Sequence, residues 1–343
     1  MPQYQHLGGE RVEDVAIDYI LESKFNMQAN GKPVTSPDTS DTHTECSMQV
    51  ASRLIRSHLP FGVITKSSLD QLDKVKVLIL SNVHMMDLEE CESIRRWVAR
   101  GGKLIATGGT SLVDKLGRQQ PDFMLADVLG VSIVSADWSS RNHYVAPSKG
   151  GEAILPEFSA KYPAFSEGQF FRVKAHEESK VLATTVLPWP RDDGSKFSSI
   201  HSDPPWQPTN HPEITRHAFG KGEAIYCNTL IEKMENAESA LVRLVRMLNK
   251  SYRFEVEAPK SVEVTMFRQP DRNRYVMSLL NFQKELPNIL VEGIRCRLNV
   301  NESIKAINEL AAAASIPFQG TESGIEFRAP RLETLLQFEA VWS

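Results

Sequence analysis

The sequence has few cysteines and no cysteine cluster. Its four cysteines are widely separated, and none forms a CxxC pair or a Cys/His group with the spacing of a zinc site. A structural metal is therefore not expected. The thiols are predicted to be buried and free in a reducing compartment, with an isolated reactive thiol as the alternative. These residues are Cys46, Cys91, Cys227 and Cys296.

The sequence also lacks a charge excess of one sign and a long apolar run. Its net charge is -4 with a pI near 6.2, and short basic groups such as Arg95, Arg96 and Arg100 are interleaved with acids. No stretch approaches the ~18 consecutive apolar residues of a membrane span, and residues 1–10 lack the apolar segment of a signal peptide. Nucleic acid and membrane are therefore not expected as partners, and a soluble, cytoplasmic protein is predicted.

The length and composition indicate two compact domains. A chain of 343 residues, 41% of them hydrophobic, can bury two cores. Apolar and acidic residues alternate over 11–20, which predicts a first strand, whereas residues 27–44 are polar and rich in turn-forming residues. We therefore expect residues 1–44 to be a partly disordered segment with one possible strand.

The strongest pattern lies between residues 75 and 109. Two apolar runs flank an amphipathic helix with Asp87 at its N-cap, Glu90 three residues later and Gly101 at its end. Strand, helix and strand at this length predict a βαβ crossover, and nearly continuous apolar strands indicate a parallel sheet covered on both faces. The predicted fold class of the first domain is therefore α/β, doubly wound.

Weaker patterns complete this domain, which we expect to span residues 45–253. Helical spacing, apolar runs and turn residues give the approximate limits of its other elements. The expected elements are a helix over 45–55, a strand over 61–65, a mostly helical stretch over 112–131, a strand-rich insertion with long loops over about 132–220, a strand over 223–230 and a helix over 237–248.

After Lys250 the pattern changes from helical to strand-like. Short apolar runs separated by turn clusters predict a small antiparallel β-sandwich over residues 254–343. The runs lie at 262–267, 274–282, 290–300 and 332–342.

Several segments carry a resemblance to known families. They are HTECSMQVASRLIRSHLPFGVI at 43–64, VLILSNV at 77–83, LEECESIRRWVARGGKLIATGGTSLVD at 88–114 and DFMLADVLGV at 122–131, followed by SSIHSDPPWQPTNHP at 198–212, GKGEAIYCN at 220–228 and APKSVEVTMFRQPDRNRYVMSLLNFQKELP at 258–287. The first four resemble the β-galactosidase trimerisation domain, a glutamine amidotransferase-like, flavodoxin-like fold that has lost the amidotransferase chemistry. The later three resemble parts that follow in multidomain glycoside hydrolases of the β-galactosidase or α-L-fucosidase type.

This resemblance implies a role in carbohydrate metabolism without a catalytic centre. In such enzymes a (β/α)8 barrel with the catalytic acid and nucleophile precedes the matched part, and about 45 residues stand there in this sequence against the ~250 that a barrel needs. The chain is thus expected to be an oligomerisation or accessory part, a pseudoenzyme, either from a truncated gene model or as a stand-alone remnant. Its expected partners are further copies of itself, as a dimer or trimer, or a glycoside hydrolase barrel.

The turn after residue 107 is where an active amidotransferase of this fold would carry its cysteine. Gly108, Gly109 and Thr110 stand there instead, so we interpret them as a degenerate nucleophile elbow. Thr110 and Ser111 are better explained as capping residues than as nucleophiles. The segment also lacks a Walker lysine and a GxGxxG spacing, and no cofactor is expected.

Paired carboxylates, which glycoside hydrolysis requires, cannot be distinguished from surface charge in this sequence. A solvated face or capping of the helix dipole explains Glu89, Glu90 and Glu92 on one helix, and the same explanation holds for Glu232 and Glu235 at the start of another. No catalytic residue is therefore nominated.

Histidines and acids gather between residues 201 and 217 in a group that has the composition of a metal or acid–base site. Their spacing matches no zinc motif, and prolines next to them favour a structural role in a loop. The group consists of His201, Asp203, His211, Glu213 and His217.

Two tryptophans in the same region leave carbohydrate contact open as an alternative. An indole face can stack on the apolar face of a sugar ring, and tryptophans in loops are unusual enough to suggest such a role. The candidate carbohydrate-binding residues are Trp189, His201, Asp203, Trp206 and His211, in the 189–217 loop region. Three functions remain in competition: an accessory and oligomerisation role, a carbohydrate-binding protein or residual glycosidase that uses this loop region, and a redox or amidotransferase-like enzyme.

Overall fold

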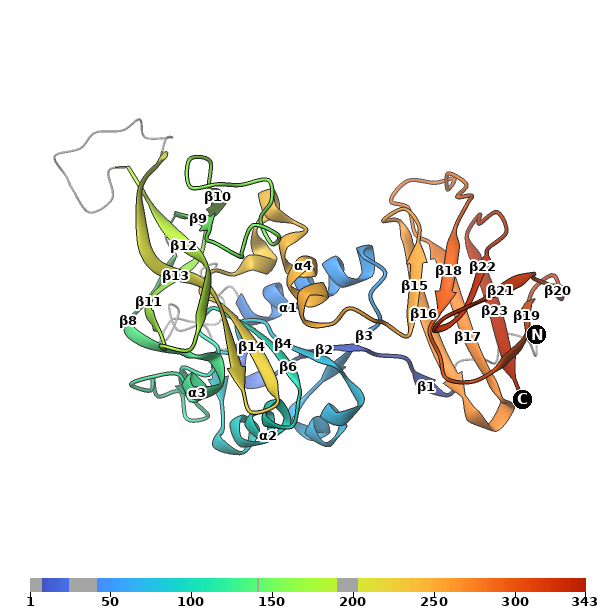
Figure 1. Ribbon diagram of the computed structural model, residues 1–343, viewed down its shortest axis with the longest axis horizontal. Coiled ribbons are helices and arrows are strands. Elements are labelled where there is room, and N and C mark those ends of the chain that lie inside the picture. The colour runs from blue at the N-terminus through green and yellow to red at the C-terminus, as the bar shows by residue number, and fades with distance from the viewer. Residues whose placement is uncertain (1–7, 25–41, 141, 190–202) are drawn as a thin grey trace. The chain divides into compact units, whose positions relative to one another are not determined.

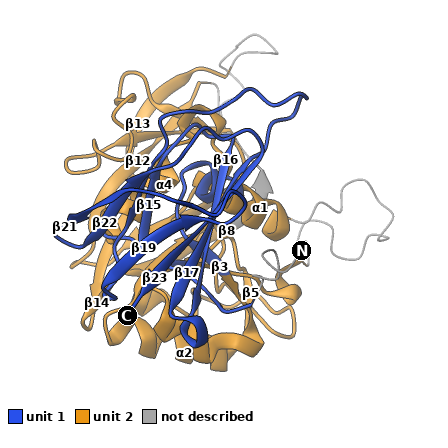
Figure 2. Cartoon of the chain, turned by 90° about the vertical axis from the view of Figure 1, so that its right-hand side faces the viewer, with its two compact units in different colours: residues 1–15, 52–62, 250–343 blue, residues 16–51, 63–249 orange. Residues whose placement is uncertain are grey.

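The computed structural model describes residues 8–24, 42–140, 142–189 and 203–343 (Figure 1). Contacts divide the chain into two compact units (Figure 2). The first unit comprises Met1–Val15, Ser52–Gly62 and Lys250–Ser343, and the second comprises Ala16–Ala51 and Val63–Asn249. Each unit therefore combines segments that are distant in the sequence.

A nine-stranded mixed sheet organises the second unit. Its three central strands β14, β6 and β4 run parallel to one another, and β13, β12, β9 and β10 extend it through antiparallel pairs. The strand order is β10 (Ala164–Ser166), β9 (His143–Pro147), β12 (Lys180–Pro188), β13 (Pro205–Phe219), β14 (Gly222–Cys227), β6 (Lys103–Thr107), β4 (Val77–Leu80), β2 (Val15–Asp18) and β3 (Phe61–Ile64).

The predicted βαβ crossover is confirmed. Strand β4 leads through helix α2 (Leu88–Ala99) to β6, which pairs with β4 in parallel. At the start of α2, the Asp87 carboxylate accepts a hydrogen bond from the Glu90 amide at 2.9 Å, and the Glu90 carboxylate accepts one from the Asp87 amide at 2.7 Å. After the helix, Gly101 takes a φ of +125°, which favours glycine.

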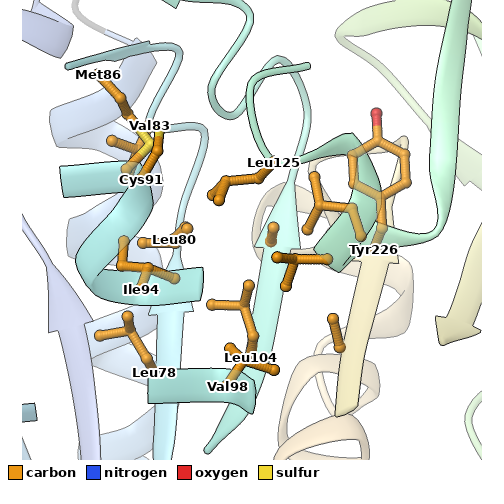
Figure 3. Close-up of a cluster of buried hydrophobic side chains, with 14 of the residues drawn as sticks. Leu78, Leu80, Val83, Met86, Cys91, Ile94, Val98, Leu104, Leu125 and Tyr226 are labelled. Atoms are coloured by element: carbon orange, nitrogen blue, oxygen red, sulfur yellow. The ribbon is translucent and has the colours of Figure 1, made fainter. Parts of the chain in front are cut away.

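Apolar residues on both faces bury this part of the sheet. On one face, Leu78, Leu80 and Leu104 pack with Ile94 and Val98 of α2 (Figure 3), and all five are completely buried. The alternating residues of the same strands point to the opposite face because the side-chain period of a strand is two, and all of them except Lys103 are buried as well. Helix α4 (Ala240–Leu248) lies on the side of β4 and β6 away from α2 (Figure 1).

The remaining helical segments of the described residues are short, except for α1. They are α1 (Thr42–Arg56), α3 (Ala126–Leu129) and the 3-10 turns η2 (Leu21–Lys24), η4 (Lys66–Lys74), η5 (Ile231–Lys233), η6 (Glu235–Ala237) and η7 (Pro270–Arg272). Over the ranges that the structure describes, no helix has both the length and the apolar character of a membrane span.

The expectation of a mostly helical stretch over 112–131 is wrong. Only α3 is helical there, and strand β7 (Val113–Asp114) pairs in parallel with β5 (Met85–Met86). The Asp114 carboxylate accepts the backbone N–H groups of Leu116 and Arg118 at 2.9 and 3.0 Å, and Gly117 has a φ of +78°. This turn competes with helix formation because the side chain takes the place of backbone acceptors.

Two antiparallel sheets make up most of the first unit. One has the strand order β1 (Glu10–Arg11), β16 (Val262–Gln269), β17 (Arg274–Asn281), β23 (Leu335–Trp342), β19 (Ile304–Glu309) and β20 (Ala314–Ser315). The other has the order β15 (Phe254–Glu257), β18 (Arg295–Leu298), β22 (Gly324–Arg328) and β21 (Phe318–Thr321). Side chains of both sheets form one core, in which the rings of Phe327 and Phe338 lie 5.2 Å apart.

A two-stranded antiparallel sheet completes the described elements of the second unit. Strand β8 (Val131–Ser140) pairs with β11 (Gln169–Ala175), with two register shifts along their length. Buried side chains from both strands, Val131 and Phe171 among them, join the core beneath α2.

Candidate functional site

Polar side chains gather at the carboxyl ends of the parallel strands, the usual place for a site in an α/β sheet. Asn82 follows β4, Thr107 ends β6 and Asn228 follows β14, and all three are almost completely buried. Helix α1 and the turn η5 bring further buried polar residues to them. We call this group the carboxyl-edge cluster; it consists of His43, Ser47, Ser81, Asn82, Thr107, Thr110 and Glu232.

Threonine hydroxyls lock the turn after β6. The Thr107 hydroxyl accepts a hydrogen bond from the backbone N–H of Asn82 at 2.9 Å and donates one to the Glu232 carboxylate at 2.8 Å. The Thr110 hydroxyl lies 2.7 Å from the Thr107 carbonyl and accepts from the Val83 amide at 3.1 Å. Both hydroxyls are buried and engaged with the protein, so neither is presented to a substrate.

The glycines of this turn serve its tight packing. Gly108 has a φ of +58°, and a Cβ there would lie 2.5 Å from the Asn82 side-chain oxygen. The same oxygen accepts a hydrogen bond from the Gly109 amide at 3.0 Å. The three residues interpreted as a degenerate elbow thus lie together after β6, where the asparagine side chain fills the space in front of them.

His43 holds the start of α1 against the sheet. Its Nε2 accepts a hydrogen bond from the Ile20 amide at 3.2 Å, so Nδ1 carries the proton and donates to the Ser81 carbonyl at 2.8 Å. Tyr19 stacks on the ring at 5.2 Å, and the hydroxyls of Ser47 and Ser81 are 2.9 Å apart. A neutral imidazole with both nitrogens engaged has a structural role.

Two carboxyl groups that the sequence analysis assigned to surface charge are buried. Glu90 is 2% exposed because its carboxylate turns back to cap α2, and Glu232 is 0% exposed beneath the Thr107 hydroxyl. Glu89, Glu92 and Glu235 are exposed as expected. The spacing of Glu90 from Asp87 indicates its capping contact, whereas the surface interpretation was wrong for Glu232 because no local spacing indicates its contact with the buried Thr107 hydroxyl.

Thiols near Glu232 are not nucleophiles. Burial raises the pKa of Cys46 well above its usual value, and the neighbouring Glu232 carboxyl raises it further. The pKa of Cys227 rises for the same two reasons. All four cysteines are free and buried, as predicted, and a protonated, buried thiol is chemically inert.

A second buried polar group links the antiparallel extension to the parallel strands. The Glu213 carboxylate on β13 accepts a hydrogen bond from the Thr185 hydroxyl on β12 at 2.6 Å, and lies 3.8 Å from His143 Nε2 on β9. Asn228 Nδ2, just after β14, is 3.4 Å from the same carboxylate. Burial raises the pKa of Glu213, whereas His143 and Thr185 act in the opposite direction. Sequence reasoning placed Glu213 in a histidine group but missed His143, which is 70 residues away.

The candidate carbohydrate-binding tryptophans lie against each other. The rings of Trp189 and Trp206 are 5.1 Å apart and nearly perpendicular at 88°, and 44% of Trp206 is exposed. The Asp203 carbonyl accepts a hydrogen bond from the Tyr144 hydroxyl at 2.5 Å. The candidate His201 lies outside the described residues. Trp206 therefore presents part of an indole surface to solvent.

His211 lies farther along β13 and is half-buried. Its amide donates to the Thr209 hydroxyl at 3.1 Å. Burial lowers the pKa of His211, and the positive charge of Arg172 lowers it further. A neutral imidazole is therefore favoured at neutral pH.

From Pro205 onward the candidate 189–217 loop region is a strand, which lies within the predicted strand-rich insertion. Strand β13 begins at Pro205 and pairs with β12 through several register shifts. Its prolines are tolerated because they lie before Ile214, where pairing with β14 starts, and thus have a strand partner on one side only. Among the side chains within the described ranges, no group of three or more His, Cys, Asp or Glu residues is placed to hold a metal ion.

The fold is shared with solved glycoside hydrolases at low sequence identity. α-L-Fucosidase isoenzyme 2 from Paenibacillus thiaminolyticus matches 98% of this chain and 50% of its own, with a TM-score of 0.75 and 18% identity. A catalytic mutant of Gan42B, a GH42 β-galactosidase from G. stearothermophilus, matches 96% of this chain and 40% of its own, with a TM-score of 0.65 and 17% identity. The β-galactosidase from Bacillus circulans sp. alkalophilus matches 98% and 42%, with a TM-score of 0.66 and 15% identity.

These matches establish a mixed α/β, sheet-rich fold that forms part of larger glycoside hydrolases. The chain spans half or less of the length of these three structures. Neither a protein-family profile nor a curated protein sequence matches it.

Proposed function

We propose that this chain is a non-catalytic oligomerisation and accessory part of a β-galactosidase-like glycoside hydrolase, with a role in carbohydrate metabolism. The observation that carries the proposal is the match of nearly the whole chain to about half of three glycoside hydrolases. The closed turn after β6 supports it, because the Thr110 hydroxyl is buried and hydrogen-bonded to the Thr107 carbonyl.

We also propose a fold for each unit. The second unit would be a glutamine amidotransferase-like, flavodoxin-like domain, and the first unit a β-sandwich with one additional N-terminal strand. The parallel order of β4, β6 and β14, together with the turn at Gly108 directly after β6, supports the first assignment. Four buried, free thiols support a cytoplasmic location.

Two measurements on the purified chain test this proposal. We expect no turnover of nitrophenyl β-galactoside or nitrophenyl α-L-fucoside, and sedimentation at micromolar concentration as a dimer or trimer. Hydrolysis that disappears when one of the buried acids Glu213 or Glu232 is replaced by glutamine would contradict the non-catalytic role. A stable monomer that also fails to bind a separately produced hydrolase barrel would contradict the accessory role.

A carbohydrate-binding function is the second candidate, and the exposed indole surface of Trp206 supports it. Galactose or fucose should then quench tryptophan fluorescence in the wild type and not in Trp206→Ala. Tyr162→Ala provides a matched control because Tyr162 is 66% exposed on the same unit. Equal quenching in all three proteins would reject this function for Trp206.

A further inference from the structure

Exposed apolar side chains are concentrated on the loop that follows β17. Phe282, Leu286 and Ile289 are 66%, 82% and 76% exposed, and Leu290 and Leu335 beside them are 38% and 46% exposed. Leu335 begins β23 and pairs with Leu280, two residues before Phe282. We call these five exposed side chains the loop patch.

Polar side chains brace the same loop from inside. Asn281 Nδ2 donates hydrogen bonds to the carbonyls of Ile289 at 2.9 Å and Glu333 at 3.0 Å. Asn288 Nδ2 donates to the Asn281 carbonyl at 2.9 Å. Gln283 donates to the Ile289 carbonyl at 2.7 Å and accepts from its amide at 3.0 Å. The amides thus point inward and the apolar groups outward, which is the reverse of an ordinary surface loop.

This arrangement fits a contact surface better than chance exposure. Single exposed hydrophobic residues are normal, whereas contiguous apolar patches mark interfaces. The loop patch offers on the order of 500 Å² of apolar surface, so two copies could bury roughly 1,000 Å², much of a standard interface of ~1,600 Å². The bracing hydrogen bonds reduce the entropy that the loop loses on association.

Charges around the loop patch favour a second copy of the chain over a bilayer. Glu285, Glu292 and Glu333 lie on or beside the loop with Lys284 and Arg331. An acidic excess disfavours an anionic membrane. Lys284 and Glu285 are adjacent in the sequence of the loop, so a two-fold axis through this pair would bring each lysine close to the glutamate of the other copy.

We propose that the loop patch is the contact surface of a two-fold dimer of this chain. The proposal rests on the proposed oligomerisation role, and it adds a contact surface in the unit made mainly of residues 250–343 to the second unit, which carries the resemblance to a trimerisation domain. Phe282, Leu286 and Ile289 form the apolar centre of the interface, and the Lys284 and Glu285 pairs fix its orientation.

Sedimentation of the full chain tests the apolar centre. The double variant Leu286→Asp, Ile289→Asp should raise the dimer dissociation constant at least tenfold, because four carboxylates would enter the interface. Leu116→Asp, at a site that is 69% exposed on the other unit, should leave the dissociation constant unchanged. Circular dichroism checks that the variants are folded.

A charge exchange tests the two-fold symmetry. Lys284→Glu should weaken the dimer, and adding Glu285→Lys should restore it, since both copies carry both changes. If the wild type and the apolar double variant associate equally well, the loop patch is not the interface, but the oligomerisation role is retained. A wild type that stays monomeric would overturn both, and failure of the charge exchange to restore association would overturn the two-fold geometry.

Discussion

Asp18 is the side chain whose replacement should reveal most about the carboxyl edge of the sheet. It ends β2 and is completely buried, and neither carboxylate oxygen has a hydrogen-bond partner in the part of the chain that the structure describes. Burial raises the pKa of Asp18 well above its usual value, and the nearby Glu90 carboxyl raises it further. The folded protein therefore favours the neutral acid.

The direction of the pH dependence follows from this difference. The unfolded chain ionises Asp18 near its ordinary value, about 4, whereas the folded chain holds the proton to higher pH. The free energy of unfolding therefore falls as pH rises above about 4, until the raised folded pKa is passed. Asp18→Asn cannot ionise, so at alkaline pH it should gain about 1.4 kcal/mol relative to the wild type for each unit by which folding raises the pKa of Asp18.

Thermal unfolding across a pH series measures this effect. Asp18→Asn should match the wild type within error near pH 4 and exceed it at pH 8 by ~2–4 °C for each kcal/mol gained. Asp271→Asn is a suitable control because the side chain of Asp271 is 77% exposed. If Asp18→Asn instead lowered the melting temperature equally at every pH, Asp18 would have to be a satisfied group, and the reasoning would be refuted.

Local sequence patterns were sufficient for the βαβ crossover and for four strands of the first unit, β16, β17, β18 and β23, but not for its other strands. The capping box at Asp87 and Glu90 depends on residues three positions apart. The nearly continuous apolar runs of β4 and β6 indicate strands that are buried on both faces. Such signals act within one turn or one strand, so they can be read without tertiary contacts.

The polar interior could not be predicted in the same way. Glu213 contacts Thr185, His143 and Asn228, which come from three other places in the chain, and no local spacing indicates that they meet. Similarly, the prolines of this segment predicted a loop. The strand β13 tolerates them because its part before Ile214 pairs with β12 and not with β14, and the sequence does not show this. When the burial of a polar residue depends on distant partners, its residue type alone predicts an exposed position.

The remaining predictions concern the turns that close the two ends of β6. Gly102→Ala should cost about 1–3 kcal/mol of unfolding free energy, because its Cβ would lie 2.4 Å from the ring of buried Trp97; urea unfolding followed by tryptophan fluorescence measures this. Thr107→Val keeps the shape of the side chain but removes the hydroxyl between the Asn82 amide and the Glu232 carboxylate. It should cost roughly 1–3 kcal/mol in the same assay, because both buried groups lose that partner, whereas Thr107→Ser should recover most of this loss. Equal stability of the valine and serine variants would mean that Thr107 contributes through its methyl group, and the hydroxyl would then not be what closes the carboxyl edge.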